Sequence, residues 1–210
     1  MTGPGGAAPH ANPVEHRDDE GARLGMWLFL LSELLLFGGL FVAYAAYRYG
    51  NRAAFHHAGH ELSATLGVAN TVVLLTSSLT VVLAVNALRA GREREAPRWV
   101  ALTILLALAF LCVKAVEWST KYRHGLFPGL PGLGALPTGE RLFFGLYFAA
   151  TGLHALHVIV GACVLAVAGT LVARGRVRRD APVLLENAGL YWHLVDVIWI
   201  FILPLFYLAA

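Results

Sequence analysis

Long apolar runs separated by short polar segments dominate the pattern of this 210-residue chain. A bilayer core needs about 20 mainly apolar residues for each helix that crosses it. Five stretches of the chain reach that length, at about 24–47, 66–88, 98–118, 142–172 and 189–208. The fourth is the longest, so we expect it to tilt or to project beyond the membrane. The pattern predicts an all-α fold, a bundle of five transmembrane helices that makes up one domain at 24–210.

The composition agrees with a chain that is embedded in a lipid bilayer. Hydrophobic residues make up 58% of the chain and charged residues 14%, whereas soluble domains carry about 25% charged residues. The first 23 residues differ, since Gly, Ala, Pro and a charged cluster at 15–20 fill them. Such a segment buries too little apolar surface to fold alone. We therefore predict a disordered tail at 1–23, with the first helix serving as the insertion signal.

The positive charges between the predicted helices indicate how the bundle is oriented. The N-terminal tail and the segments 89–98 and 174–179 lie on one side and carry 10 of the 16 Lys and Arg residues. The opposite side carries 5. Lys and Arg are enriched in cytoplasmic loops. The N-terminus is therefore predicted to be cytoplasmic and the C-terminus to lie outside, which in a bacterium is the periplasm.

Seven ionisable side chains fall inside the predicted spans, where charge is costly and a functional role is the first hypothesis. They are Glu33, Lys114, Glu117, His154, His157, His193 and Asp196. Six of them form pairs three residues apart, a spacing that places both members on one helix face. Lys114 and Glu117 have opposite charges, so a structural ion pair is the simpler interpretation of that pair.

Glu33 has no cation in its own span. We expect it to stay a neutral acid that packs inside the bundle, or to lie beside a proton path or a partner subunit. Gly38 and Gly39 follow on the same helix and would allow another helix to approach closely. The residues leave packing and proton transfer both open for Glu33.

The three intramembrane histidines raise the question of a metal or haem site. The spacing of His154 and His157 suits two ligands on one helix, but only His193 offers a third imidazole. Hydrogen bonds between helices are therefore favoured, and we predict no metal site and no catalytic residue. His193 is expected to donate to Asp196 one turn later. Small polar residues favour tight helix packing, and we assign that role to Asn70, Ser77, Ser78 and, as a buried aromatic, Trp199.

Five segments carry a resemblance to a known family. They are "GMWLFLLSELLLF" with Glu33, "NTVVLLTSS" from Asn70, "KAVEW" from Lys114, "ATGLHALHVIVG" from Ala150 and "YWHLVDVIWIF" from Tyr191. In this order they resemble subunit III of the haem-copper terminal oxidases, the cytochrome c oxidase subunit 3 family. The resemblance extends from about Leu24 to Tyr207.

The resemblance implies an accessory subunit of an oxidoreductase and translocase complex in a bacterial inner membrane. Such a subunit binds no haem or copper itself and packs against subunit I, which holds them, with subunit II in the same complex. The complex oxidises cytochrome c or quinol, reduces oxygen to water and pumps protons. Subunit III is expected to stabilise subunit I, support proton uptake and bind phospholipid, and no nucleic acid is implied. Glu33 matches a buried carboxylate of the family, and the family's recurrent intramembrane polar positions are matched by Glu117, His154, His157, His193 and Asp196.

One departure and several alternatives accompany this resemblance. The mitochondrial form has seven helices and this chain five, so the two helices that form one wall of a lipid-holding cleft are missing. The alternatives within the same fold are a five-helix protein associated with nitric oxide reductase and subunit III of a quinol oxidase. A transporter would need inverted repeats or broken helices, which the sequence does not show. A haem-bearing enzyme and an assembly factor are the remaining alternatives.

The predicted orientation can be tested with a reporter fused after Ala210. A reporter that is active only outside the cytoplasm should be active in this fusion, because the Lys and Arg residues hold the opposite side in the cytoplasm. The same reporter inserted in the segment 89–98 should be inactive. Activity only in the second fusion would overturn the orientation.

Overall fold

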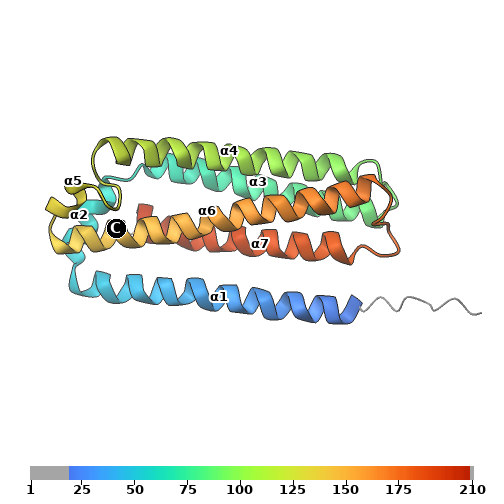
Figure 1. Cartoon of the computed structure of the whole chain (residues 1–210), viewed down its shortest axis with the longest axis horizontal. Helices are drawn as coiled ribbons and strands as arrows, with labels where there is room; N and C mark the ends of the chain where they lie inside the picture. The colour runs from blue at the N-terminus through green and yellow to red at the C-terminus, as the bar shows by residue number, and fades with distance from the viewer. Residues whose placement is uncertain (1–18, 209–210) are drawn as a thin grey trace, which may run out of the picture.

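Five long helices run side by side along the length of the structure (Figure 1). The computed structural model describes residues 19–208 and contains no strand within them. The long helices are α1 (Asp19–Gly50), α3 (Ala64–Arg89), α4 (Ala96–Arg123), α6 (Thr138–Ala173) and α7 (Val183–Leu203), the last continued by a π-helical turn, η1 (Pro204–Leu208). All five, α7 being counted with η1, are long and apolar enough to cross a membrane. The predicted all-α, five-helix fold is confirmed.

The helices are longer than the apolar runs because polar residues extend both ends. Helix α1 begins at Asp19, so residues 19–23, which we assigned to the tail, are helical. Asp19 and Glu20 lie in its first turn, where negative side chains interact favourably with the helix dipole. Residues 1–18 of the predicted tail lie outside the described residues. Two short helices occupy the loops at one end of the bundle, α2 (Arg52–His60) and α5 (Pro131–Ala135).

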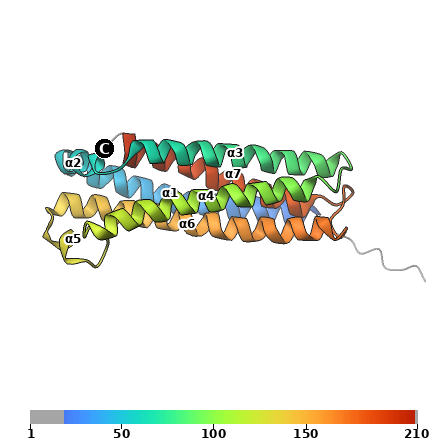
Figure 2. The ribbon, with the colours of Figure 1, turned by 90° about the horizontal axis from the view of Figure 1, so that it is seen from above.

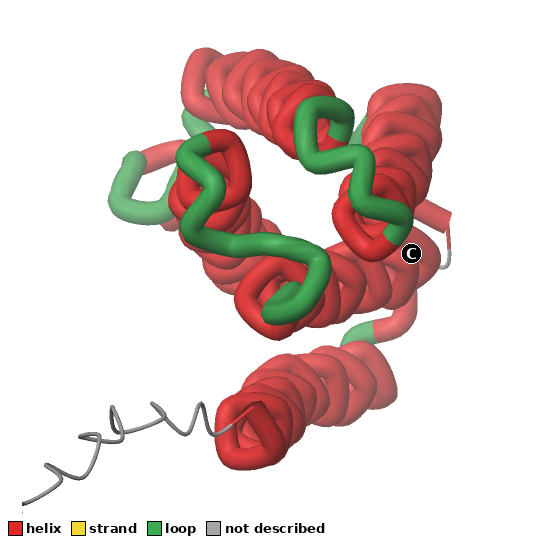
Figure 3. Tube along the Cα trace, turned by 90° about the vertical axis from the view of Figure 1, so that its right-hand side faces the viewer, coloured by secondary structure: helices red, strands yellow, loops and turns green. Residues whose placement is uncertain are grey.

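Helices α3, α4, α6 and α7 form a closed ring, and α1 lies outside it (Figures 2 and 3). Within the ring, α3 packs against α4 and α7, and α6 packs against the same two helices. Helix α1 contacts α6 and α7 along its length and α2 at its end. Most of the remaining surface of α1 is exposed and apolar, with Trp27 61% and Leu35 68% exposed. In a bilayer such a surface is available to lipid or to another transmembrane helix.

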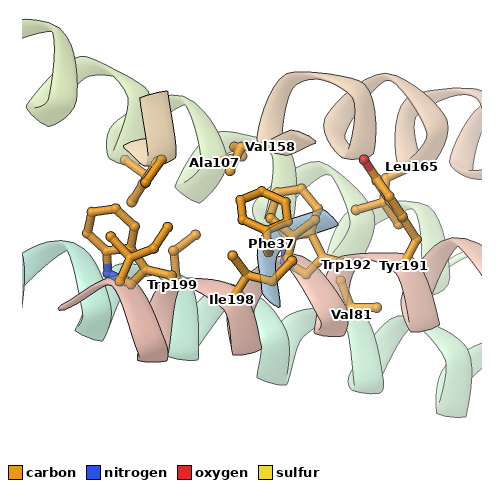
Figure 4. Packing of buried hydrophobic residues seen from close by; sticks show 14 of the residues in the cluster. Phe37, Val81, Ala107, Val158, Leu165, Tyr191, Trp192, Ile198 and Trp199 are labelled. Carbon is orange, nitrogen blue, oxygen red and sulfur yellow. The ribbon is translucent and has the colours of Figure 1, made fainter. Parts of the chain in front are cut away.

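Large aromatic side chains fill the centre of the ring (Figure 4). Trp192 and Trp199 of α7 are fully buried, and Phe37 of α1, also fully buried, lies in the same cluster. Both indole N–H groups have partners, since Trp192 donates to Ser77 Oγ and Trp199 to Thr71 Oγ1, each at 3.0 Å. Buried indoles commonly find such a partner, and here both bonds join α7 to α3.

Glycines allow the helices to approach closely at particular points. A Cβ atom added at Gly161 would lie 2.9 Å from Trp192 Cε3, and one at Gly169 would lie 2.9 Å from Val100 Cγ1. Gly38 and Gly39, which we expected to serve this purpose, have no atom of the described structure within 4 Å of such a Cβ. That expectation is wrong for contacts within the chain, because α1 is the least enclosed helix and these two glycines do not face its neighbours.

We predict that Gly161→Ala lowers the midpoint of thermal unfolding of the chain in detergent. The added methyl group would overlap the ring of Trp192, which is fully buried. Overpacking of this kind costs about 1–3 kcal/mol. The matched control is Gly38→Ala, which meets nothing and should be neutral or stabilising because alanine favours helix. Equal midpoints for the two variants would contradict the packing at Gly161.

Candidate functional site

A buried charged cluster joins α4, α6 and η1 near one end of the bundle. Lys114 Nζ lies 2.9 Å from Glu117 Oε2, and the two side chains are 3% and 4% exposed. The ammonium also donates to Tyr147 Oη at 3.0 Å and to Tyr207 Oη at 2.8 Å. Both tyrosine hydroxyls in turn donate to Glu117 Oε1, at 2.9 and 2.7 Å. The predicted ion pair is present, and two tyrosines enclose it.

This cluster leaves no donor of the lysine open. An ammonium group has three N–H donors, and Glu117, Tyr147 and Tyr207 supply three acceptors. The ammonium also lies 5.4 Å from the centre of the Trp199 ring, a distance at which a cation is attracted to the ring face. A buried ion pair is tolerated when further hydrogen bonds satisfy both partners. The arrangement is therefore a structural connection between three segments rather than a site open to a substrate.

Glu33 has a partner that its own helix could not supply. Its Oε2 lies 2.8 Å from Nε2 of His157, on α6, and the two side chains are 15% and 12% exposed. The other ring nitrogen of His157, Nδ1, lies 2.7 Å from the backbone oxygen of Leu153. A carbonyl oxygen only accepts, so Nδ1 must carry a proton.

The protonation of the Glu33–His157 pair follows from this geometry. With Nδ1 protonated, Nε2 either accepts a proton from a Glu33 carboxylic acid or donates one to a Glu33 carboxylate. One proton lies between the two groups in both cases, and the pair carries no net charge. A carboxylate facing an unprotonated Nε2 would set two lone pairs against each other. The geometry is therefore that of a two-residue unit without net charge, and it does not test our prediction that Glu33 itself is a neutral acid.

His193 does not bond Asp196 as we expected. Its Nδ1 lies 2.6 Å from Ser78 Oγ, so the imidazole joins α7 to α3. The two oxygens of Asp196 are buried and have no hydrogen-bond partner within residues 19–208. The predicted bond was wrong because it was based only on the spacing of His193 and Asp196 along one helix. The Ser78 hydroxyl of α3 lies closer to the imidazole and takes its place.

His154 and Asn70 are buried without a hydrogen-bond partner among the described residues. The His154 ring contacts Phe110 and Trp199, at centroid distances of 5.4 and 5.1 Å. The three intramembrane histidines thus have separate surroundings, and residues 19–208 contain no group of three or more His, Cys, Asp or Glu placed to hold a metal. Of the residues assigned to packing, Ser77, Ser78 and Trp199 form bonds between helices.

Two features of the site were missed in the sequence. Tyr147 and Tyr207 complete the charged cluster, and only the presence of tyrosines at the ends of apolar spans would have suggested them. Glu186 accepts from Arg23 of α1 at 3.0 Å and from Arg89 of α3 at 2.8 Å, so one carboxylate joins three helices at the opposite end. Its position just before the last predicted span gave no indication of two partners more than 90 residues away.

We predict that Lys114→Met destabilises the chain by about 3–5 kcal/mol, since it leaves Glu117 buried without its cation. The double variant Lys114→Met with Glu117→Leu should recover much of this loss, because two apolar side chains replace both charges. The measurement is the thermal midpoint in detergent for the single variant, the double variant and the parent chain. A double variant that is less stable than the single one would contradict a buried ion pair.

Comparison with known proteins extends over nearly the whole chain. The family model described as cytochrome c oxidase subunit III matches residues 8–210. A cytochrome c oxidase subunit 3 from Danio rerio is 32% identical and is aligned with 92% of this chain and 70% of its own length. A probable quinol oxidase subunit 3 from Staphylococcus haemolyticus is 29% identical over 95% of both chains.

A third relative joins two subunits in one chain. It is a haem-copper oxidase subunit I+III from Aeropyrum pernix, 32% identical over 89% of this chain and 22% of its own length. The match of the family model over residues 8–210 includes all five long helices and the buried polar residues described above. The chain therefore belongs to the cytochrome c oxidase subunit III family.

Proposed function

We propose that this chain is the subunit III of a proton-pumping haem-copper terminal oxidase and holds no redox centre of its own. The observation that carries the proposal is the family match over residues 8–210. The site geometry supports the non-redox role. The two nitrogens of His157 are directed at Leu153 and Glu33, and Nδ1 of His193 is directed at Ser78. The His154 ring contacts the rings of Phe110 and Trp199.

Subunit I is the proposed main partner, in a complex that also contains subunit II. The Aeropyrum pernix relative carries subunits I and III in one chain. The covalent connection holds these two subunits close to each other in that protein. The exposed apolar surface of α1 and its neighbours is of the kind that packs against transmembrane helices. In this complex the chain would stabilise subunit I, support proton uptake, and contact membrane lipids, including bound phospholipid. The membrane is proposed to be a bacterial inner membrane.

The electron donor has two candidates. The first is cytochrome c, in agreement with the family name and with the Danio rerio relative. The second is quinol, favoured by the Staphylococcus haemolyticus relative, which matches this chain over 95% of both lengths.

Purification of the tagged chain in mild detergent tests the proposed function. Subunits I and II should co-purify in equal amounts, with the absorption spectrum of haem. The complex should consume oxygen with reduced cytochrome c or with quinol, and the preferred donor decides between the two candidates. An untagged strain is the control for nonspecific capture. Recovery of a nitric oxide reductase, or of the chain alone with its own haem spectrum, would contradict the proposal.

A further inference from the structure

A hollow lies between α3 and α7, at the end of the bundle that we predict to face the cytoplasm. The two helices lie side by side (Figure 2), and the hollow between them has a volume of about 250 Å³. Arg89 and Glu186 line its outer end, where they bond each other at 2.8 Å. His193 lines its inner end. Seven residues of α7 separate Glu186 from His193, a rise of about 10 Å, so the hollow reaches into the span.

The polar side chains of this hollow allow water to enter it from the helix ends. Water inside a protein needs room and hydrogen-bond partners. Arg89, Glu186 and the exposed Asn86 supply partners at the outer end, and the His193 imidazole supplies one at the inner end. Valine and leucine side chains form the wall between the two ends. Water at the inner end therefore has the imidazole as its partner.

The inner end of the hollow leads through two side chains to a buried carboxyl group. His193 is partly exposed, and its Nδ1 lies 2.6 Å from the Ser78 hydroxyl oxygen. Asp196 is one turn further along the same face of α7, and the Ser78 hydroxyl also lies beside its carboxyl group. The Asp196 residue is 4% exposed, and neither carboxyl oxygen has a hydrogen-bond partner within residues 19–208. Because a serine hydroxyl can rotate, Ser78 is placed to serve His193 and Asp196 in turn.

We propose that His193, Ser78 and Asp196 form a proton relay through which the buried carboxyl group exchanges its proton with water in the hollow. An unpaired buried carboxylate is costly, so Asp196 is protonated at rest. Asp196 gives its proton to Ser78 Oγ, the hydrogen of the Ser78 hydroxyl passes to Nδ1 of His193, and Nε2 releases its own proton to water. Asp196 has then lost one proton, and Ser78 and His193 are again neutral. The reverse sequence reloads the carboxyl group and restores the first tautomer of the imidazole.

The lack of a bonded partner distinguishes Asp196 from the other intramembrane carboxyl groups. Glu33 bonds His157, and Glu117 bonds Lys114, so each of these two carboxyl groups is held in a pair. Asp196 has no such pair within residues 19–208, and its proton is therefore the one that a change of partner can move. The relay deepens the proposed support of proton uptake and rests on that proposal for its role in the complex. The exchange itself requires no turnover.

Infrared spectroscopy of the purified complex, transferred from H₂O to D₂O without an electron donor, tests the relay. The carbonyl stretch of a protonated carboxyl group shifts to lower frequency on deuteration, and the band that Asp196→Asn removes belongs to Asp196. We expect this band to shift in the parent complex. His193→Gln keeps a hydrogen bond to Ser78 but takes up no proton. His193→Gln and Ser78→Ala should each slow the shift at least about 10-fold, because a buried group without a relay exchanges only by local opening.

Ser77→Ala is the matched control. It removes the neighbouring hydroxyl, which accepts from Trp192, so it costs one bond between α3 and α7 as Ser78→Ala does. Its Asp196 band should shift at the parent rate. If Asp196→Asn is not recovered in the complex, Asp196→Glu identifies the band by moving it.

Three results would overturn the relay. They are exchange at the parent rate in His193→Gln and Ser78→Ala, equal slowing in Ser77→Ala, and the absence of any protonated carboxyl band that depends on Asp196. A relay that fails in an assembled haem-containing complex leaves the proposed function standing. If the chain is recovered without subunit I, the proposed function fails, and the same spectra of the chain alone still decide whether Asp196 exchanges through His193 and Ser78.

Discussion

The cost of placing charge in a bilayer is the constraint on which the rest of the structure depends. Lys114 and Glu117 remain in an apolar environment because each finds the other and both are bonded by Tyr147 and Tyr207. These four side chains come from α4, α6 and η1, so satisfying one ammonium group fixes three segments. In lipid, where apolar helix faces gain little by contacting each other, such polar connections and close packing determine which helices associate.

The same reasoning explains how α1 is held outside the ring. Three side-chain contacts are spaced along it, from Arg23 to Glu186, from Glu33 to His157 and from the Tyr44 hydroxyl to the backbone oxygen of Leu205. Each lies near an end or the middle of the helix. Apolar packing alone would specify α1 poorly, since most of its surface is exposed. The middle contact shares one proton within a neutral pair, which avoids a net charge at a partly exposed position.

Not every buried polar group is satisfied in this way. Asn70, His154 and Asp196 have no hydrogen-bond partner within the described residues, although each lies on a helix of the ring. An unpaired buried polar group costs about 1–3 kcal/mol, and ordered water usually supplies the missing bonds. These positions are therefore where internal water is expected, and they contrast with the closed cluster around Lys114.

The number and approximate position of the five long helices follow from the sequence, because the length of an apolar run is a local property that the thickness of the bilayer requires. The short helices α2 and α5 were not predicted. The sequence also predicted the Lys114–Glu117 pair, whose members are one turn apart on one helix. The partners that come from other helices depend on the tertiary structure. Spacing suggested His193 with Asp196, whereas Ser78 of α3 takes the imidazole. Glu33 lacked a partner until α6 brought His157 to it. Contacts between residues more than 100 positions apart depend on which helices are neighbours, and a pattern along one helix does not contain that information.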